Sequence, residues 1–153
     1  MVKLVVYDFD GVLTDNRVLV HQDGTEAVFC NRSDGWWIKE IRKLGVEQCI
    51  LSTEKNPVVK ARADKIGLPC AQGLDDKLGG LKQLLAERKL AASEICYVGN
   101  EMNDYDCFKV AGHTLAPRDS HPEILRLAHY VIPCDGGAGI VRHVYEWLRE
   151  KNR

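Results

Sequence analysis

Two aspartates, Asp8 and Asp10, follow directly on the short apolar run Leu4-Val5-Val6-Tyr7, and Gly11 comes soon after them. Such a run predicts a buried β-strand, which places both carboxylates at its carboxyl end and on the same side. Two like charges this close repel each other, and burial strengthens the repulsion. A bound cation or a shared proton would relieve it, so the pair predicts a metal site or an acid–base site.

Other polar side chains also follow apolar runs that resemble strands. They are Ser52-Thr53-Glu54, Lys77 at the start of a predicted helix, and Gly99-Asn100-Glu101-Met102-Asn103-Asp104. The carboxyl ends of parallel strands meet at one edge of a sheet, where ligands of such folds bind. We therefore expect these groups to converge with Asp8 and Asp10.

This set of side chains suits a divalent cation and a phosphate. Mg²⁺ prefers oxygen ligands, and Asp8, Asn100 and Asp104 can supply side-chain oxygens, with the backbone carbonyl of Asp10 adding one. The predicted cofactor is Mg²⁺, and the predicted metal residues are therefore Asp8, Asp10, Asn100 and Asp104.

The same residues can carry out phosphoryl transfer. An ionised carboxylate such as Asp8 can attack phosphorus and form an aspartyl-phosphate. The second carboxylate, Asp10, can protonate the leaving alkoxide and later activate water. Thr53 and Lys77 would hold the non-bridging phosphoryl oxygens. The predicted catalytic residues are Asp8, Asp10, Thr53 and Lys77.

Strand-like and helix-like segments alternate along the chain, which predicts parallel crossovers and a doubly wound, Rossmann-like α/β sheet. The strands are expected at Leu4–Tyr7, Val46–Leu51, 69–71, Ile95–Val98, Thr114–Ala116 and Tyr130–Val131. One β-hairpin interrupts the pattern, with strands at Val18–His21 and Ala27–Phe29 around the turn Asp23-Gly24. We expect one domain over residues 1–153, with the hairpin as a flap at about 17–30.

The composition excludes several classes of partner. A formal net charge of -1 gives no reason to expect nucleic acid or an anionic membrane surface. No apolar run approaches the length of a membrane span, and the N-terminus has no signal-peptide pattern. The six cysteines are scattered without a C-x-x-C pair, so we expect free thiols in a reducing cytoplasm.

Four motifs together resemble the haloacid dehalogenase (HAD) phosphatase superfamily. They are the segment Asp8-Phe9-Asp10-Gly11-Val12-Leu13-Thr14-Asp15, then Thr53, Lys77 and the segment Gly99–Asp104, in the order of that superfamily. The resemblance covers essentially the whole chain. It implies a HAD-like fold and an Mg²⁺-dependent phosphomonoesterase that works through an aspartyl-phosphate. No segment is long enough for the large cap domain of many relatives.

Within that superfamily the chain is similar to the capless phosphatases of keto-sugar acids. The resemblance implies a homotetramer in which a neighbouring subunit closes each active site. Glu54, with Arg62 and Lys65 on the next predicted helix, is similar to the branch that acts on nine-carbon acids of the sialic acid type, where this set lines the leaving-group pocket. The first prediction is therefore a nine-carbon 9-phosphate as substrate. The alternative is the eight-carbon 3-deoxy-octulosonate 8-phosphate.

Simpler interpretations stand beside these. Glu54, Arg62 and Lys65 have the spacing of an ordinary charged helix face, and most lysines, Lys77 included, could be solvated. Trp36 and Trp37 suit core or interface packing better than a substrate platform. The alternative of another class is a non-catalytic oligomerisation or regulatory module, like the domain that follows some sialic acid cytidylyltransferases. Transfer of the phosphoryl group to an acceptor other than water is also open.

Overall fold

The computed structural model describes residues 1–153 and contains a six-stranded, fully parallel β-sheet. The strand order is β5-β4-β1-β6-β7-β8. The strands are β1 (Leu4–Tyr7), β4 (Glu47–Leu51), β5 (Cys70–Ala71), β6 (Ile95–Val98), β7 (His113–Pro117) and β8 (Tyr130–Ile132). The predicted doubly wound α/β architecture is confirmed, and each expected strand is present.

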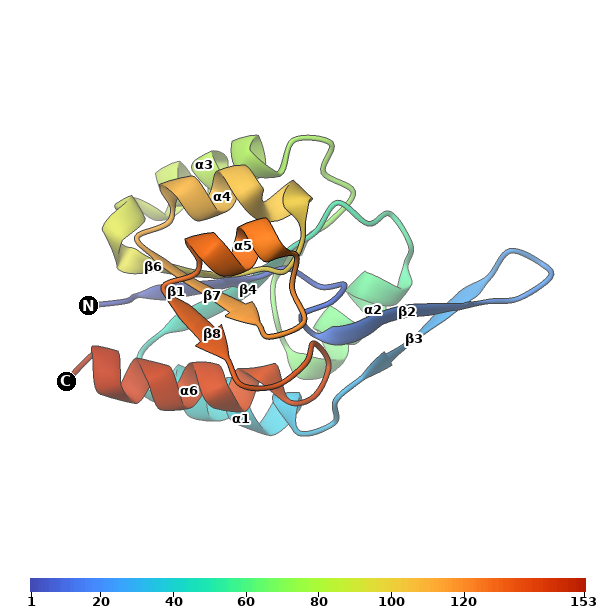
Figure 1. Ribbon diagram of the computed structural model, residues 1–153, viewed down its shortest axis with the longest axis horizontal. Helices are drawn as coiled ribbons and strands as arrows, with labels where there is room; N and C mark the ends of the chain where they lie inside the picture. Colours follow the sequence, from blue (N-terminus) through green and yellow to red (C-terminus); the bar gives the residue numbers. More distant parts are fainter.

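Helices cover both faces of this sheet, as Figure 1 shows. One face carries α3 (Lys77–Arg88), α4 (Tyr105–Val110) and α5 (Pro122–Leu127), and the other carries α1 (Asp34–Lys43), α2 (Val58–Ile66) and α6 (Ile140–Lys151). Two short 3₁₀ turns, η1 (Ala92–Glu94) and η2 (Met102–Asp104), flank β6. None of the helices combines the length and apolar character that a membrane crossing needs.

The position of β1 inside the sheet explains why its sequence is apolar throughout and does not alternate with polar residues. All four of its residues are fully buried: Val5 and Tyr7 pack into the core on the α1/α6 side, and Leu4 and Val6 into the core on the α3 side. A strand covered on both faces has no polar side to present. The chain leaves β1 for β4 on one side and returns to β6 on the other, so the ligand crevice is expected at the carboxyl end of β1.

The local signals at helix ends act as expected. The Asp76 carboxylate caps α3 by accepting a hydrogen bond from the backbone N–H of Gly79 at 2.8 Å. Gly67, with φ of 73°, ends α2 in the left-handed conformation that glycine favours. The cap places Lys77 at the first position of α3, directly beside the carboxyl end of the sheet.

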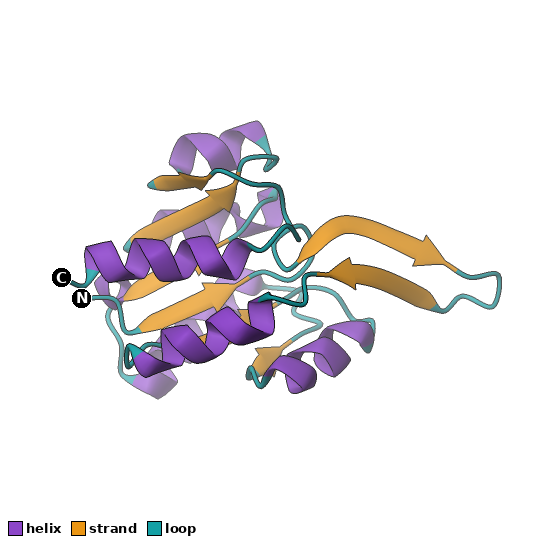
Figure 2. Ribbon diagram, turned by 90° about the horizontal axis from the view of Figure 1, so that it is seen from below, coloured by secondary structure: helices purple, strands orange, loops and turns teal.

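The hairpin of β2 (Thr14–Val20) and β3 (Glu26–Cys30) projects away from the body (Figures 1 and 2). It begins four residues earlier than the sequence predicts, because Thr14, which leaves the loop after β1, already pairs with Cys30. The pairing register then shifts between Thr14 and Val18, which marks a β-bulge. The bulge breaks the alternation of side chains, and so the sequence pattern alone did not indicate a strand there.

Candidate active site

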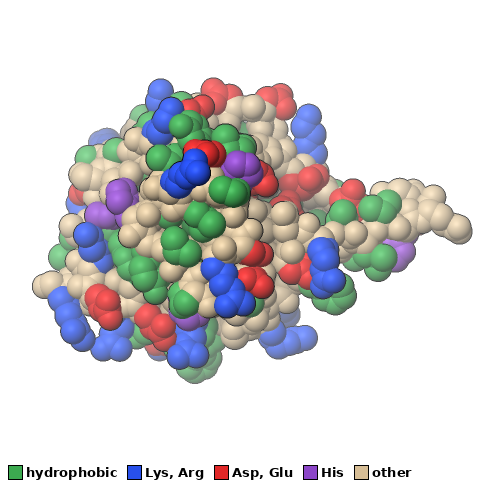
Figure 3. Space-filling view, viewed as in Figure 1, with side chains coloured by type: hydrophobic (Ala, Val, Ile, Leu, Met, Phe, Trp, Pro, Cys, Tyr) green, Lys and Arg blue, Asp and Glu red, His purple; other side chains and the backbone are tan.

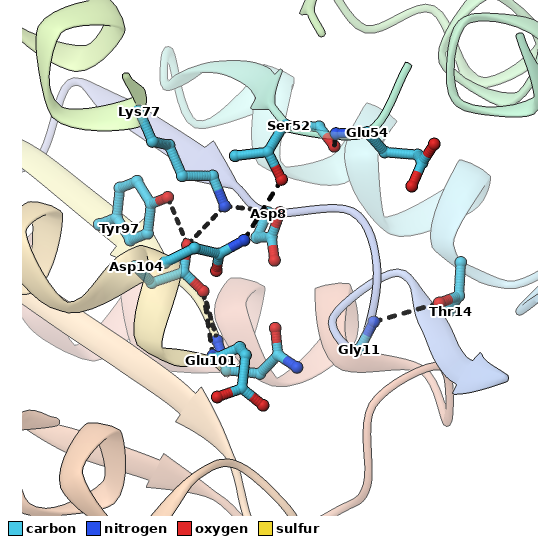
Figure 4. Close-up of polar contacts among 12 residues, drawn as sticks. Asp8, Gly11, Thr14, Ser52, Glu54, Lys77, Tyr97, Glu101 and Asp104 are labelled. Atoms are coloured by element: carbon cyan, nitrogen blue, oxygen red, sulfur yellow. Dashed lines mark hydrogen bonds and ion pairs between the residues drawn. The ribbon is translucent and has the colours of Figure 1, made fainter. Parts of the chain in front are cut away.

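Three charged side chains form a buried cluster at the carboxyl end of β1 (Figure 4). The ammonium nitrogen of Lys77 lies 2.8 Å from Asp8 Oδ1 and 2.6 Å from Asp104 Oδ1. Each of the three residues is at most 5% exposed. One cation therefore serves two carboxylates away from water, which leaves a buried negative charge for a further cation to balance.

Asp104 has three further hydrogen-bond partners besides Lys77. Its Oδ1 also accepts a hydrogen bond from the Tyr97 hydroxyl at 2.7 Å, and its Oδ2 accepts bonds from the backbone N–H groups of Asn100 and Glu101 at 2.9 and 3.2 Å. Both of its oxygens are thus occupied within the protein. In this arrangement Asp104 anchors Lys77 and the loop after β6.

Burial sets the ionisation of the cluster. Burial, reinforced by the charge of Asp104 and opposed by Lys77, raises the pKa of Asp8 to about 7. Burial alone would lower the pKa of Lys77, but the charges of Asp8 and Asp104 outweigh it and hold that pKa above its usual value. Lys77 is therefore a permanent cation beside Asp8.

One end of the Asn100 side-chain amide meets two oxygen atoms on the open side of Asp8. This end lies 2.9 Å from the carbonyl oxygen of Asp10 and 3.1 Å from Asp8 Oδ2. With its nitrogen at this end, the amide donates a hydrogen bond to both oxygens; with its oxygen there, the three oxygens need a cation between them. Neighbouring ligands of an octahedral Mg²⁺ ion with bonds of 2.0–2.1 Å lie about 3 Å apart. The donor set and its spacing therefore fit Mg²⁺, with an amide and a carbonyl beside one carboxylate.

Two glycines let the loop after β1 adopt this shape. Gly11 has φ of 80°, and a Cβ there would lie 2.0 Å from the Asn100 amide nitrogen. Behind the loop, a Cβ on Gly136 would lie 2.0 Å from the carbonyl oxygen of Gly11, and the Gly137 N–H donates to the Val12 carbonyl at 2.9 Å. The glycine-rich segment before α6 thus packs directly against the loop that carries Asp10.

A cavity of about 320 Å³ opens in front of Asp8, between the sheet edge and the hairpin. Asp8, Asp10, Thr53, Glu54 and Asn100 all line it. A second hollow contains Thr53 together with Lys77. Figure 3 shows acidic side chains gathered where the hairpin leaves the body. The cavity brings together most of the residues predicted from the sequence.

Asp10 lies half-buried in the cavity wall. Burial, with the carboxylates of Glu54 and Glu26 adding to it, raises the pKa of Asp10. A carboxyl group with a raised pKa holds a proton more readily, which is what a general acid requires.

Arg62 and Lys65 lie outside this cavity, although the sequence analysis predicts that they line the leaving-group pocket together with Glu54. The Arg62 guanidinium donates a hydrogen bond to the Asn31 carbonyl at 2.8 Å, and Lys65 is exposed on α2. Their spacing puts them on one helical turn but does not say which side of the molecule that turn faces. Within this chain only Glu54 of the three is placed to meet a leaving group.

Sequence reasoning missed Tyr97, which bonds to Asp104, because a tyrosine inside an apolar strand reads as ordinary core. Trp37 packs against Tyr145 with ring centroids 5.2 Å apart, as expected of a core aromatic, whereas Trp36 is 64% exposed. Neither tryptophan lines the cavity. All six cysteines are free.

Comparison with known proteins identifies the class to which this fold and site belong. The family model for haloacid dehalogenase-like hydrolases matches residues 71–144. The chain is also 30% identical to the 3-deoxy-D-manno-octulosonate 8-phosphate phosphatase of Yersinia pestis over 148 residues, which span 96% of this chain and 79% of the relative. The chain therefore belongs to the haloacid dehalogenase-like hydrolases, as the four motifs predicted. Within that family it is a phosphatase.

Solved structures agree with this assignment. A candidate HAD family hydrolase from Streptomyces avermitilis is 42% identical, with a TM-score of 0.92 over 95% of this chain and 84% of that one. The 3-deoxy-D-manno-octulosonate 8-phosphate phosphatase of Moraxella catarrhalis is 27% identical, with a TM-score of 0.92 over 99% of this chain and 88% of that one. Its crystal structure contains a magnesium ion, a phosphate ion and a KDO molecule.

Proposed function

We propose that this phosphatase hydrolyses the phosphomonoester of a keto-sugar acid, with Asp8 as nucleophile. The observation that carries the proposal is the buried Asp8–Lys77–Asp104 cluster, which lies beside the Asn100 amide and the Asp10 carbonyl and opens onto a polar cavity. A carboxylate held in place by a neighbouring ammonium is oriented for in-line attack on phosphorus.

The reaction runs in two steps on this chain's own groups. Asp8 attacks phosphorus and forms an aspartyl-phosphate, while Asp10 gives its proton to the alkoxide that leaves. Asp10, now ionised, then takes a proton from the water that hydrolyses the aspartyl-phosphate. The raised pKa of Asp10 supports the first of these roles and its position beside Asp8 supports both.

Of the four predicted metal residues, Asp8, Asp10 (through its carbonyl) and Asn100 would hold Mg²⁺ directly. Asp104, the fourth, would instead keep Asn100 in position by accepting a hydrogen bond from the Asn100 backbone N–H. When bound, the ion would neutralise the charge that clusters there and the charge of the phosphoryl oxygens. Thr53 and Lys77, which share a hollow, would donate hydrogen bonds to those same oxygens.

Two substrates remain candidates, and different observations favour them. The eight-carbon 3-deoxy-octulosonate 8-phosphate is favoured by the names of the relatives that align over nearly the whole chain. The nine-carbon 9-phosphate is favoured by Glu54, which lines the cavity, although Arg62 and Lys65 do not join it there. The eight-carbon substrate therefore has the broader support.

A homotetramer, in which neighbouring copies cover each cavity, is proposed from the hairpin. Val18, Leu19, Val20 and Phe29 are each more than half exposed on a hairpin that projects from the body. Apolar side chains gathered on such an extension are typical of a subunit interface.

The test is phosphate release, with and without Mg²⁺, from a panel of eight-carbon and nine-carbon keto-sugar-acid phosphates and common sugar phosphates. Mg²⁺-dependent release from one of the acids supports the proposal, and the ratio of kcat/KM values for the two acids selects the substrate. Asp8→Asn should abolish release while the fold, checked by circular dichroism, is unchanged. No release by the folded wild-type protein with Mg²⁺ bound would instead favour the non-catalytic module.

A further inference from the structure

Arg17, on the hairpin strand β2, is the only basic side chain that lines the cavity. Five carboxylates line it as well, contributed by Asp8, Asp10, Glu26, Glu54 and Glu101. Asp8 and Asp10 belong to the reacting end, whereas the three glutamates are exposed and lie toward the mouth. An anionic leaving group would meet mostly negative charge there, and one cation, Arg17, could offset it.

The position of Arg17 separates it from the phosphate end. Lys77, the cation beside Asp8, has a side chain only 3% exposed, whereas that of Arg17 is 82% exposed. Lys77 therefore lies buried behind Asp8 and outside the lining of this cavity, whereas Arg17 lies at the cavity rim. A sugar acid whose phosphate lies on Asp8 would extend its remaining atoms toward the rim.

The backbone around Arg17 is built to direct it. Asn16 adopts φ of 65°, and the pairing register shifts between Thr14 and Val18. The buried Thr14 hydroxyl oxygen accepts hydrogen bonds from the N–H groups of both Asn16 and Gly11, each at 3.1 Å. Bulges of this kind often redirect a side chain next to an active site. Here the bulge is tied to the same loop that carries Asp10.

Asp15 fixes the orientation of the guanidinium. Its Oδ2 accepts hydrogen bonds from Arg17 Nε at 3.0 Å and Nη2 at 2.8 Å, and its Oδ1 accepts one from the Arg17 backbone N–H at 3.0 Å. A guanidinium has five N–H donors in a fixed plane, so the edge formed by Nη1 and the second Nη2 hydrogen stays free. That edge matches the two oxygens of a carboxylate.

We infer that Arg17 binds the carboxylate of the leaving sugar acid and thereby selects acids over neutral sugar phosphates. This inference rests on the proposed function, because it names the part of the same substrate that lies farthest from phosphorus. Lysine at this position would keep the charge and lose the paired donors, and Asp15→Asn would keep arginine and loosen its orientation.

The experiment compares wild type, Arg17→Ala, Arg17→Lys and Asp15→Asn on keto-sugar-acid phosphates and on glucose 6-phosphate. Arg126→Ala, which removes an exposed arginine of α5 outside the cavity, is the matched control. For Arg17→Ala we expect KM for the acid to rise about 10- to 100-fold with kcat within a few-fold, and kcat/KM for glucose 6-phosphate to change less than two-fold. The Lys and Asn variants should fall between.

A second measurement does not depend on turnover. Calorimetric titration with the free keto-sugar acid, in the presence of Mg²⁺ and inorganic phosphate, should show weaker binding to Arg17→Ala by a similar factor. An equal loss on both kinds of ester, or no loss on either, would overturn the inference while leaving the phosphatase proposal intact. Failure of the wild-type protein to release phosphate from any ester would refute the proposed function and this inference with it.

Discussion

Gly136 offers a sharp test of how the loop after β1 is held. A Cβ at this position would lie 2.0 Å from the Gly11 carbonyl oxygen, 2.6 Å from its carbon and 3.0 Å from the Thr14 carbonyl oxygen. Its φ lies outside the left-handed region, so Gly136→Ala adds a steric conflict without backbone strain of its own. The atoms that would be struck are backbone atoms, which cannot rotate away as the end of a flexible side chain can.

The size of the expected effect follows from these distances. Real Cβ contacts are essentially never shorter than 3.0 Å, so the two backbones must separate by about 1 Å. Gly11 cannot simply move forward, because Asn100 already fills the space in front of it. A shift of about 1 Å in a reacting group can cost about 10²-fold in rate. We expect that loss in kcat, together with weaker Mg²⁺ binding and about 1–3 kcal/mol of lost stability.

The assay measures kcat, KM, the Mg²⁺ concentration for half-maximal activity, and thermal unfolding with and without Mg²⁺. Gly35→Ala is the matched control, because its Cβ would meet only Ile66 at an ordinary 3.6 Å and it lies in helix α1. The control should keep full activity and unfold at the same or a higher temperature. A folded Gly136→Ala protein with unchanged kcat and Mg²⁺ affinity would refute the idea that this contact positions Asp10.

Three further predictions concern the buried charges and the hairpin. Burial raises the pKa of Asp34 to about 6, so the stability that its protonated form contributes is present below about pH 4 and is lost as the pH rises through about 6. In urea unfolding, Asp34→Asn should therefore be more stable than wild type at pH 7, by up to about 3 kcal/mol, and equally stable near pH 4. Lys77→Met should lose activity and about 3–5 kcal/mol of stability at pH 7, because two buried carboxylates lose their cation, whereas Lys82→Met on the exposed side of α3 should change neither. Phe29→Asp should dissociate an oligomer in analytical ultracentrifugation, and an unchanged sedimentation coefficient would contradict the proposed hairpin interface.

The sheet was predictable because its signals are local and agree with one another. The fully apolar β1, the Asp76 cap and the Gly67 stop each define an element from a few neighbouring residues. The convergence of Asp8, Lys77 and Asp104 then follows from the rule that parallel strands end at one edge.

Features that depend on how the elements pack against one another could not be predicted from local sequence signals. The i, i+3 spacing of Arg62 and Lys65 predicts a shared helix turn, and only the packing of α2 decides that neither side chain lines the cavity. The partnership of Tyr97 with Asp104 likewise has no sequence signal. The bulge at Asn16 had a weak sequence signal, because asparagine tolerates the left-handed region of backbone conformation. The polar stretch Thr14–Arg17, however, lacks the alternation of apolar and polar residues that predicts a strand.

The hairpin lines the cavity while the body of the fold carries the buried charged cluster, and this separation has an evolutionary consequence. The hairpin supplies Asn16, Arg17, Val18, Glu26 and Val28 to the cavity wall, yet of these only Val28 packs against the core. Substitutions at Arg17 and Glu26 would therefore cost little stability, whereas Asn16 is constrained by its left-handed backbone conformation. The buried Asp8–Lys77–Asp104 cluster tolerates almost no change, because each member neutralises or anchors another. Lineages built on this plan can diversify the molecules they dephosphorylate while inheriting one unaltered reaction.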